Sequence, residues 1–208
     1  MSLAASLVRG ADAPPLIEHT IGEALALAAA RWGEREALVA VEQDVRWTFA
    51  ELLARADAVA AGLLALGLEP GERIGIWAPN CVEWTLTQFA AARAGLILVT
   101  INPAYRTSEA SFTMAKVGLA ALVFVDRFKT SDYAAMVAEL APDLPALRRI
   151  LCIGDASRPG WIPFDQVAAH ADEAARARLK AIGPELRAGD AINIQFTSGT
   201  TGQPKGAT

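Results

Sequence analysis

The sequence predicts a three-layer α/β/α fold built around a mostly parallel sheet. Segments with strand character alternate with amphipathic segments of helical period along most of the 208 residues, and this order is typical of parallel sheets with right-handed crossovers. The middle strands are continuous runs of Val, Ile, Leu and Ala, as expected when helices cover both faces of a sheet. With 53% hydrophobic residues, the chain is able to bury a sizeable core.

The N-terminal part predicts a helix, a small hairpin and a second helix. Thr20 and Glu23 have the spacing of a capping box, which predicts a helix over residues 20–33. Two short β-like runs at 36–41 and 45–49 are separated by three polar residues and predict the hairpin. Thr48 and Glu51 form a second capping box, and the helix after them is expected to end near Gly67. Its predicted inward-facing residues are Leu52, Ala56, Val59, Leu63 and Leu64.

Strands and helices then alternate to the end of the chain. Strands are expected over residues 72–78, 96–101, 119–126, 148–153 and 191–197. Helices are expected over 82–94, with a cap at Asn80, from a cap at Ser108 to near Gly118, and over 132–140 and 172–182. Residues 156–163 contain Pro and Gly and predict a surface loop.

Composition and charge argue against several function classes. The net charge of -4 and the absence of a basic cluster make nucleic-acid binding a poor hypothesis. No apolar run approaches the ~18–20 residues of a membrane-spanning helix, and the N-terminus lacks the charged region of a secretory signal. We therefore expect a cytoplasmic protein. Cys81 and Cys152 are predicted to be buried thiols, and the isolated His19 and His170 suggest no metal site.

The most informative stretch is FTSGTTGQPKGAT, at residues 196–208. Glycines let the main chain approach a ligand closely, and successive N–H groups in such a loop form an anion-binding concavity. The hydroxyl groups add donors, and a lysine adds a compact positive charge that reaches a polyphosphate. A flexible turn between two strands is the competing interpretation. The candidate phosphate-binding residues are Thr197, Ser198, Gly199, Thr200, Thr201, Gly202 and Lys205.

This loop does not match the two common nucleotide-binding motifs. In a Walker A loop, glycine precedes the lysine and Ser or Thr follows it. Here Pro204 precedes Lys205 and Gly206 follows it. No G-x-G-x-x-G follows any expected strand, so the dinucleotide fingerprint is absent too.

The ordered string TSGTTGQPKG resembles the phosphate-binding signature of the adenylate-forming superfamily, which includes acyl-CoA synthetases, peptide-synthetase adenylation domains and luciferases. The segment WTFAEL is similar to an early segment of that family, and residues 71–109 are similar to its first βαβ unit with the Asn-Pro that follows. The residues that flank the loop most resemble the medium- and long-chain fatty acyl-CoA synthetases.

The resemblance implies a two-step reaction with ATP, Mg²⁺ and coenzyme A. A fatty acid carboxylate attacks the α-phosphate of ATP, which gives an acyl-adenylate and pyrophosphate, and the thiolate of coenzyme A then releases AMP. The seven loop residues would stabilise the charge that develops on pyrophosphate. Only this loop carries over residue by residue, so no catalytic and no metal-binding residue is assigned within the chain.

Three further residues are weaker candidates for ligand contacts. Trp84 is expected on the apolar face of a helix, where core packing is the favoured interpretation. Asn102, before Pro103, is interpreted as part of a strand-ending turn. Tyr105 fits either role.

Proteins of this family are more than twice as long as this chain. The resemblance therefore implies that residues 1–208 are the N-terminal portion of the large AMP-binding lobe, without the rest of that lobe and without the C-terminal lobe. We expect such a fragment to be inactive alone, with a frayed terminal loop. The alternatives are a short non-catalytic interaction module, with homodimerisation through its bare surface, or a fragment of an aryl-CoA ligase or a peptide-synthetase adenylation domain.

Overall fold

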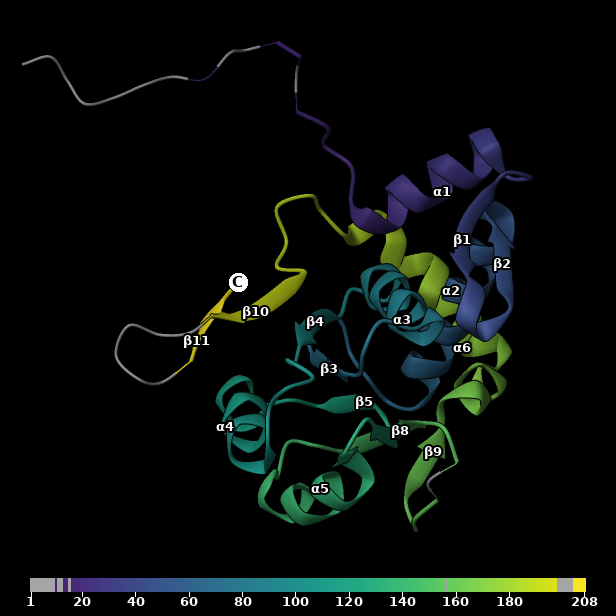
Figure 1. Ribbon diagram of the computed structural model, residues 1–208. Coiled ribbons are helices and arrows are strands. Elements are labelled where there is room, and N and C mark those ends of the chain that lie inside the picture. Colours follow the sequence, from purple (N-terminus) through teal and green to yellow (C-terminus); the bar gives the residue numbers. More distant parts are fainter. Residues whose placement is uncertain (1–9, 11–12, 15, 156, 198–203) are drawn as a thin grey trace, which may run out of the picture.

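The computed structural model describes residues 10, 13–14, 16–155, 157–197 and 204–208. A seven-stranded sheet forms the centre of the molecule, in the order β11-β10-β4-β3-β5-β8-β9. Neighbouring strands from β10 to β9 are parallel, and β11 alone runs antiparallel to its neighbour β10. Helices lie on both sides of these strands (Figure 1). The three-layer α/β/α arrangement expected from the sequence is therefore confirmed.

Three sheets contain the strands of the described residues. The seven-stranded sheet consists of β3 (Arg73–Trp77), β4 (Ile97–Thr100), β5 (Ala121–Val125), β8 (Arg149–Ile153), β9 (Trp161–Pro163), β10 (Asn193–Thr197) and β11 (Lys205–Ala207). Two small antiparallel pairs are β1 (Glu36–Ala40) with β2 (Val45–Thr48), and β6 (Arg127–Phe128) with β7 (Ser131–Asp132).

The helices follow the strands in alternation. The α-helices are α1 (Ile21–Trp32), α2 (Phe49–Ala65), α3 (Val82–Arg93), α4 (Thr107–Val117), α5 (Tyr133–Leu140) and α6 (Glu173–Ile182). Short 3₁₀ helices are η1 (Val41–Gln43), η2 (Ala141–Asp143), η3 (Phe164–His170) and η4 (Gly183–Glu185).

Local sequence signals place the first two helices correctly. The Thr20 and Thr48 hydroxyls accept the backbone N–H groups of Glu23 and Glu51 at 3.1 and 3.2 Å, and each glutamate returns a contact to its cap residue. Both capping boxes and the hairpin between the helices are thus confirmed. All five residues predicted to face inward from α2 are buried, namely Leu52, Ala56, Val59, Leu63 and Leu64.

Three local expectations are wrong. The residue that caps α3 is Cys81 rather than Asn80, and its side chain makes no cap hydrogen bond. Helix α4 begins two residues earlier than a Ser108 cap requires, because the Glu109 carboxylate accepts the N–H of Arg106 at 2.7 Å. Residues 161–163, expected in a surface loop, form β9 because they pair in parallel with β8 at the edge of the sheet.

Each face of the sheet has its own core. One core lies under α1, α2, α3 and α6 and takes Ile74, Ile76, Leu98, Ala121 and Val123 from the strands. The other lies under α4 and α5 and takes the alternate residues, including Trp77, Val99, Leu122, Phe124 and Cys152. Since side chains alternate across a strand, burial of both sets explains why these strands read as unbroken apolar runs.

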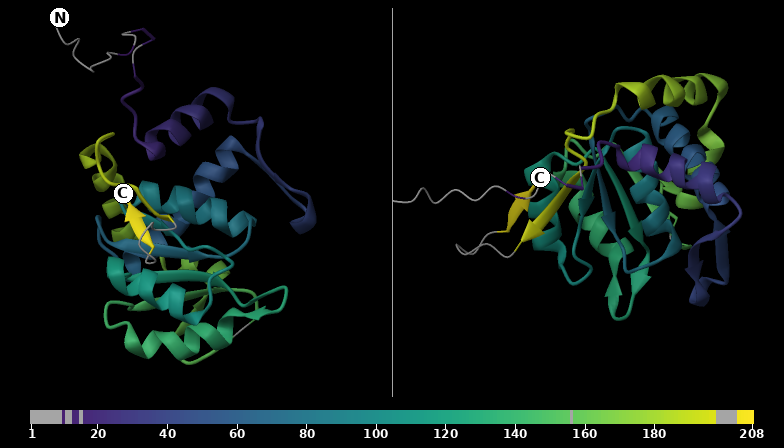
Figure 2. Two further views of the ribbon diagram at one scale, coloured as in Figure 1. Left: turned by 60° about the vertical axis from the view of Figure 1, so that its left-hand side comes forward. Right: turned by 90° about the horizontal axis from the view of Figure 1, so that it is seen from above.

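The two longer hairpins project from different sides of the molecule. Figure 2 shows the β1–β2 hairpin beside α2 and the β10–β11 hairpin on the opposite side. On β10, Ile194 and Phe196 pack against the core under α4 and α5, whereas every residue of β11 is exposed. The β10–β11 hairpin therefore rests on the sheet by one strand only.

Candidate functional site

The direction in which the chain leaves β3 and β4 defines a candidate site. Helix α3, which follows β3, packs on one face of the sheet, and α4, which follows the adjacent parallel strand β4, packs on the other. A place where successive helices change faces in this way is a topological switch point. It opens a crevice at the carboxyl ends of the strands, and open α/β sheets bind ligands in such a crevice. Strand β10 lies next to β4 in parallel, so its carboxyl end, at Thr197, opens at the same edge.

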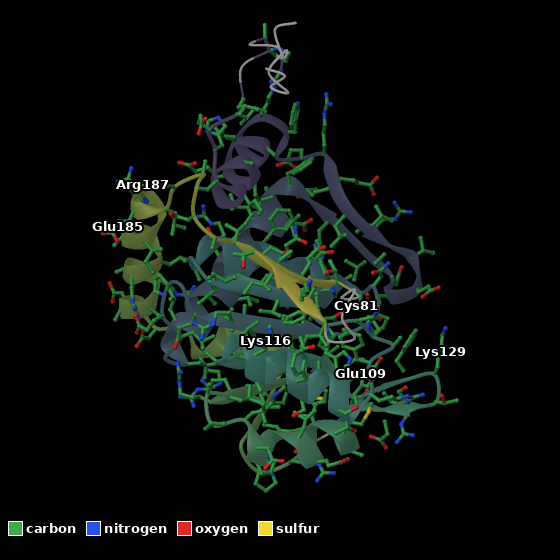
Figure 3. All side chains as sticks on the ribbon, turned by 90° about the vertical axis from the view of Figure 1, so that its left-hand side faces the viewer. Cys81, Glu109, Lys116, Lys129, Glu185 and Arg187 are labelled. Carbon is green, nitrogen blue, oxygen red and sulfur yellow. The ribbon has the colours of Figure 1, made fainter. Side chains whose placement is uncertain are left out.

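The β10–β11 hairpin carries the candidate phosphate loop at this edge. Phe196 pairs with Gly206, and Thr197 pairs with Lys205. Directly opposed residues of an antiparallel pair project from the same face, so Thr197 and Lys205 lie side by side where the loop leaves the sheet. The Thr197 hydroxyl also donates to the Lys205 carbonyl at 3.5 Å. In Figure 3, β10 and β11 cross the front of the molecule.

The structure places two of the seven candidate residues. Thr197 and Lys205 are both exposed, and their pairing brings the lysine to the start of the loop. Ser198, Gly199, Thr200, Thr201 and Gly202 lie outside the described residues, and so does most of the loop that was expected to be frayed. Residues 205–207 pair with β10 as β11, so a strand lies on each side of the loop, an arrangement that the sequence suggested only under the competing interpretation.

A crevice of about 270 Å³ lies beside the hairpin at the switch point. Segments that follow β3 and β4, the first turn of α3 and the end of β10 surround it. Its lining residues are Ala78, Asn80, Trp84, Thr100, Ile101, Asn102, Pro103, Tyr105, Gln195 and Phe196. These residues are uncharged, and several carry an amide, hydroxyl or indole N–H. Lys205, on the neighbouring hairpin, carries a positive charge at this edge, and so does Arg106, the N-cap residue of α4.

Two buried aromatic rings support one wall of the crevice. The rings of Trp77 and Tyr133 stack with centroids 4.6 Å apart. The Trp77 indole donates to the Asn102 carbonyl at 3.2 Å, and the Tyr133 hydroxyl donates to the Pro103 carbonyl at 2.6 Å. Burial raises the pKa of Tyr133 above its ordinary value, so the hydroxyl keeps its proton for this contact. The two rings therefore hold the β4–α4 connection in place through its backbone carbonyls.

The crevice includes residues that the sequence did not assign to a site. Trp84, interpreted as a core residue, is half-buried and lines the crevice as well as packing against the core. Asn102 does form the expected turn, because its side-chain oxygen accepts the N–H of Ala104 at 2.9 Å, and it also lines the crevice. Tyr105 and Gln195 join them. The sequence feature that these residues share is their position: they follow the end of a predicted strand or, as with Gln195, lie near one.

The remaining reactive groups at this edge do not suggest a nucleophile or a resident metal. Burial raises the pKa of the Cys81 thiol to about 11, so at neutral pH the thiol stays protonated and weakly reactive. Among the residues that the structure describes, no three His, Cys, Asp or Glu side chains gather closely enough to hold a metal ion.

In the same part of the chain no helix has the length and apolar character needed to cross a membrane.

Comparison with known proteins gives a consistent family assignment. Residues 25–208 match the family described as "AMP-binding enzyme". The chain is 42% identical to the mitochondrial medium-chain acyl-CoA ligase ACSF2 of Homo sapiens, over 98% of this chain and 35% of that protein. It is 39% identical to the Danio rerio ACSF2, also named a mitochondrial medium-chain acyl-CoA ligase, over 100% of this chain and 36% of that protein.

Solved structures show the same fold. The apo structure of MbtA from Mycobacterium smegmatis superposes with a TM-score of 0.76 and 29% identity, over 91% of this chain and 33% of that one. A fatty acyl CoA synthetase of Mycobacterium tuberculosis superposes with a TM-score of 0.61 and 28% identity, over 90% and 34% of the two chains.

The matched regions correspond to the N-terminal domain of adenylate-forming enzymes. The chain spans about a third of the length of the curated relatives that it matches. The match covers most of the chain, from α1 through the β10–β11 hairpin, and we conclude that this chain belongs to the AMP-binding enzyme family.

Proposed function

We propose that this chain is the phosphate-binding portion of an ATP-dependent acyl-CoA ligase that activates fatty acids. The observation that carries the proposal is the position of the TSGTTGQPKG segment: β10 and β11 hold its two ends at the carboxyl edge of the sheet, beside the switch-point crevice. Similarity to medium-chain acyl-CoA ligases supports the choice of substrate class. Residues 1–208 would form the N-terminal portion of the large lobe of that enzyme.

The chemistry of the loop fits transfer of an adenylyl group. When a carboxylate attacks the α-phosphate of ATP, the bond to pyrophosphate breaks and negative charge grows on the leaving group. Lys205 pairs with Thr197 where the loop leaves the sheet, and its ammonium group would bind a phosphate oxygen held by the loop. Hydrogen bonds to charged groups contribute roughly 1.5–3 kcal/mol each, so Lys205 would stabilise both bound ATP and departing pyrophosphate.

Magnesium and coenzyme A complete the proposed reaction. The described residues supply no acidic cluster for a metal ion, so Mg²⁺ would arrive with ATP and neutralise phosphate charge there. The hydroxyl groups assigned to the loop would donate hydrogen bonds to the negatively charged phosphate oxygens. The thiol of coenzyme A would accept the acyl group in the second step. No group of the described residues is assigned to activate that thiol.

Binding of Mg²⁺-ATP to the 208-residue chain tests the proposal directly. Titration followed by calorimetry should show binding, and Lys205→Ala should weaken it about 10- to 100-fold, the loss expected for one hydrogen bond to a charged oxygen. Lys180→Ala is the matched control, because Lys180 is an exposed lysine on α6. Equal affinity of the wild type and Lys205→Ala would contradict the assigned role.

Catalysis is tested separately from binding. We propose that the 208-residue chain releases no pyrophosphate from Mg²⁺-ATP when fatty acids of increasing length are supplied. Release that depends on the acid would show that residues 1–208 are sufficient for the first step. The expected cytoplasmic location, and the homodimer that belongs to the alternative of an interaction module, also stay predictions, to be checked by fractionation and by light scattering. The names of the two ACSF2 relatives assign those proteins to mitochondria.

A further inference from the structure

Helix α3, which begins beside the switch-point crevice, is capped by a side chain from a distant part of the fold. The first N–H groups of a helix have no partner within the helix, and Cys81 supplies none from its side chain. The N–H of Val82 instead donates to the Oε1 atom of Gln43 at 2.7 Å. Gln43 is the last residue of η1, between the two strands of the N-terminal hairpin.

A second contact fixes the orientation of the Gln43 amide. Its Nε2 atom donates to the Glu83 carboxylate at 3.0 Å. The oxygen and nitrogen of the amide thus face an N–H donor and a carboxylate acceptor in adjacent residues, and reversing the amide would break both contacts. Asp44, which follows Gln43, has φ 51° and ψ 42°, a left-handed conformation that Asp tolerates better than most residues. This bend turns the chain back into β2 directly after Gln43.

The turn that joins β3 to α3 lies between two hollows of the surface. Ala78 and Asn80 line the switch-point crevice. Asn80, Cys81 and Val82 also line a cavity of about 520 Å³ between the hairpin and α3. Asn80 is exposed, whereas Ala78 and Val82 on either side of it are buried, so the position of Asn80 depends on how those two ends are held. Strand β3 holds the first end within the sheet, and Gln43 holds the second.

We propose that Gln43 is a positioning residue for the ligand site: by capping α3 from the hairpin it sets the position of the Asn80 and Trp84 side of the crevice. The hairpin would then couple to the candidate site through one amide, although the two lie in separate parts of the fold. The identity of the ligand, Mg²⁺-ATP, rests on the proposed function. The proposal that Gln43 sets the position of this wall does not depend on the identity of the ligand.

The test uses the 208-residue chain with two readouts. In Gln43→Ala we expect the NMR signals of the Trp84 indole N–H and the Asn80 side-chain amide to shift, and Mg²⁺-ATP to bind about three- to tenfold more weakly. A double variant, Gln43→Glu with Glu83→Gln, exchanges the two groups. The carboxylate at position 43 would then accept both the backbone N–H at position 82 and the side-chain amide at position 83. Signals and affinity should therefore return toward the wild-type values.

Gln166→Ala is the matched control, because Gln166 is exposed on η3 and lines a different cavity. The proposal is overturned if Gln43→Ala leaves the Trp84 and Asn80 signals in place, or if the folded double variant fails to restore them. If the wild-type chain binds no Mg²⁺-ATP, the proposed function fails, and the NMR signals alone then decide the role of Gln43.

Discussion

The two edges of the central sheet differ in a way that bears on function. A cavity of about 420 Å³ lies at the amino edge, where β3, β4 and β10 begin, and residues such as Pro70, Leu96 and Ile192 give it a mainly apolar lining. The crevice at the carboxyl edge is smaller, at about 270 Å³, and is lined by amides and aromatic rings beside Lys205. Of these two hollows, the larger one therefore lies away from the edge that we propose for a polyphosphate.

Helix direction explains the difference. In a parallel sheet the helices begin at the carboxyl edge of the strands, so the partial positive charge of each helix N-terminus collects there. Helices α3 and α4 both begin at this edge. At the amino edge α3 ends next to Gly95, which lines the cavity, and its partial negative charge disfavours an anion; the N-terminus of α1 at Thr20 also lines this cavity, but the Glu23 carboxylate already lies against it. We therefore expect changes at the amino edge to affect stability alone, and changes at the carboxyl edge to affect binding as well.

The largest effect on stability is expected from Gly95→Ala at the amino edge. Gly95 has φ +69°, and a Cβ atom there would lie 2.9 Å from Leu186 Cδ2 and 3.2 Å from Pro70 Cβ. We expect a loss of roughly 1–3 kcal/mol in the free energy of unfolding, measured by urea denaturation, with unchanged affinity for Mg²⁺-ATP. Gly189→Ala is the control, because nothing lies within 4 Å of its added Cβ. Weaker binding by folded Gly95→Ala would break the comparison.

A smaller loss is expected from Tyr133→Phe under the carboxyl edge. The substitution removes the 2.6 Å hydrogen bond to the Pro103 carbonyl and should lower the free energy of unfolding by about 1 kcal/mol. Because Pro103 lines the crevice, Mg²⁺-ATP should also bind more weakly. Tyr105→Phe is the paired control for stability, since no hydrogen bond of its hydroxyl occurs among the described residues. Tyr133→Phe with wild-type affinity would show that this wall is not needed for binding.

The smallest effect is expected from the pH dependence of an ion pair at the amino edge. Glu72 accepts a hydrogen bond from Arg148 at 2.8 Å, and this contact holds the pKa of Glu72 below its ordinary value of 4.5. The stabilisation is therefore complete above pH 4.5 and disappears as the pH falls through the folded-state pKa.

The comparison that measures this effect is unfolding of the wild type and Glu72→Gln between pH 7 and pH 3. A difference of at most about 1 kcal/mol at pH 7 should shrink toward zero in acid. Glu36→Gln is the control, because its pair with Arg46 is more exposed. A difference that grows as the pH falls would contradict a lowered pKa of Glu72 in the folded state.

The features that the sequence predicted well are those decided within a few residues. The capping boxes at Thr20 and Thr48 need only a partner three residues on, and the buried stripe of α2 follows from helical period. The cap of α3 comes from Gln43, 39 residues away from Val82, so no local sequence pattern predicts it. Strand β9 has three residues and gains its identity only from pairing with β8.

The candidate site divides in the same way. Its loop is evident from the order of residues in one short segment, of which Thr197 and Lys205 are placed. The crevice depends instead on the strand order β10-β4-β3, because that order brings Gln195 beside Trp84 and Tyr105. Strand order depends on pairing between distant segments and cannot be read from a local pattern. The sequence therefore does not assign Trp84 or Tyr105 to the crevice.

The register of β10 against β4 has a consequence for how the molecule assembles. Asn193 pairs with Leu98, and Gln195 pairs with Thr100, so the strand beside the candidate phosphate loop joins residues from opposite halves of the chain. Closing so long a loop of chain costs entropy before any contact compensates for it. We expect β10 and β11 to dock last during folding, and their amide hydrogens to exchange with solvent sooner than those of β3 and β5.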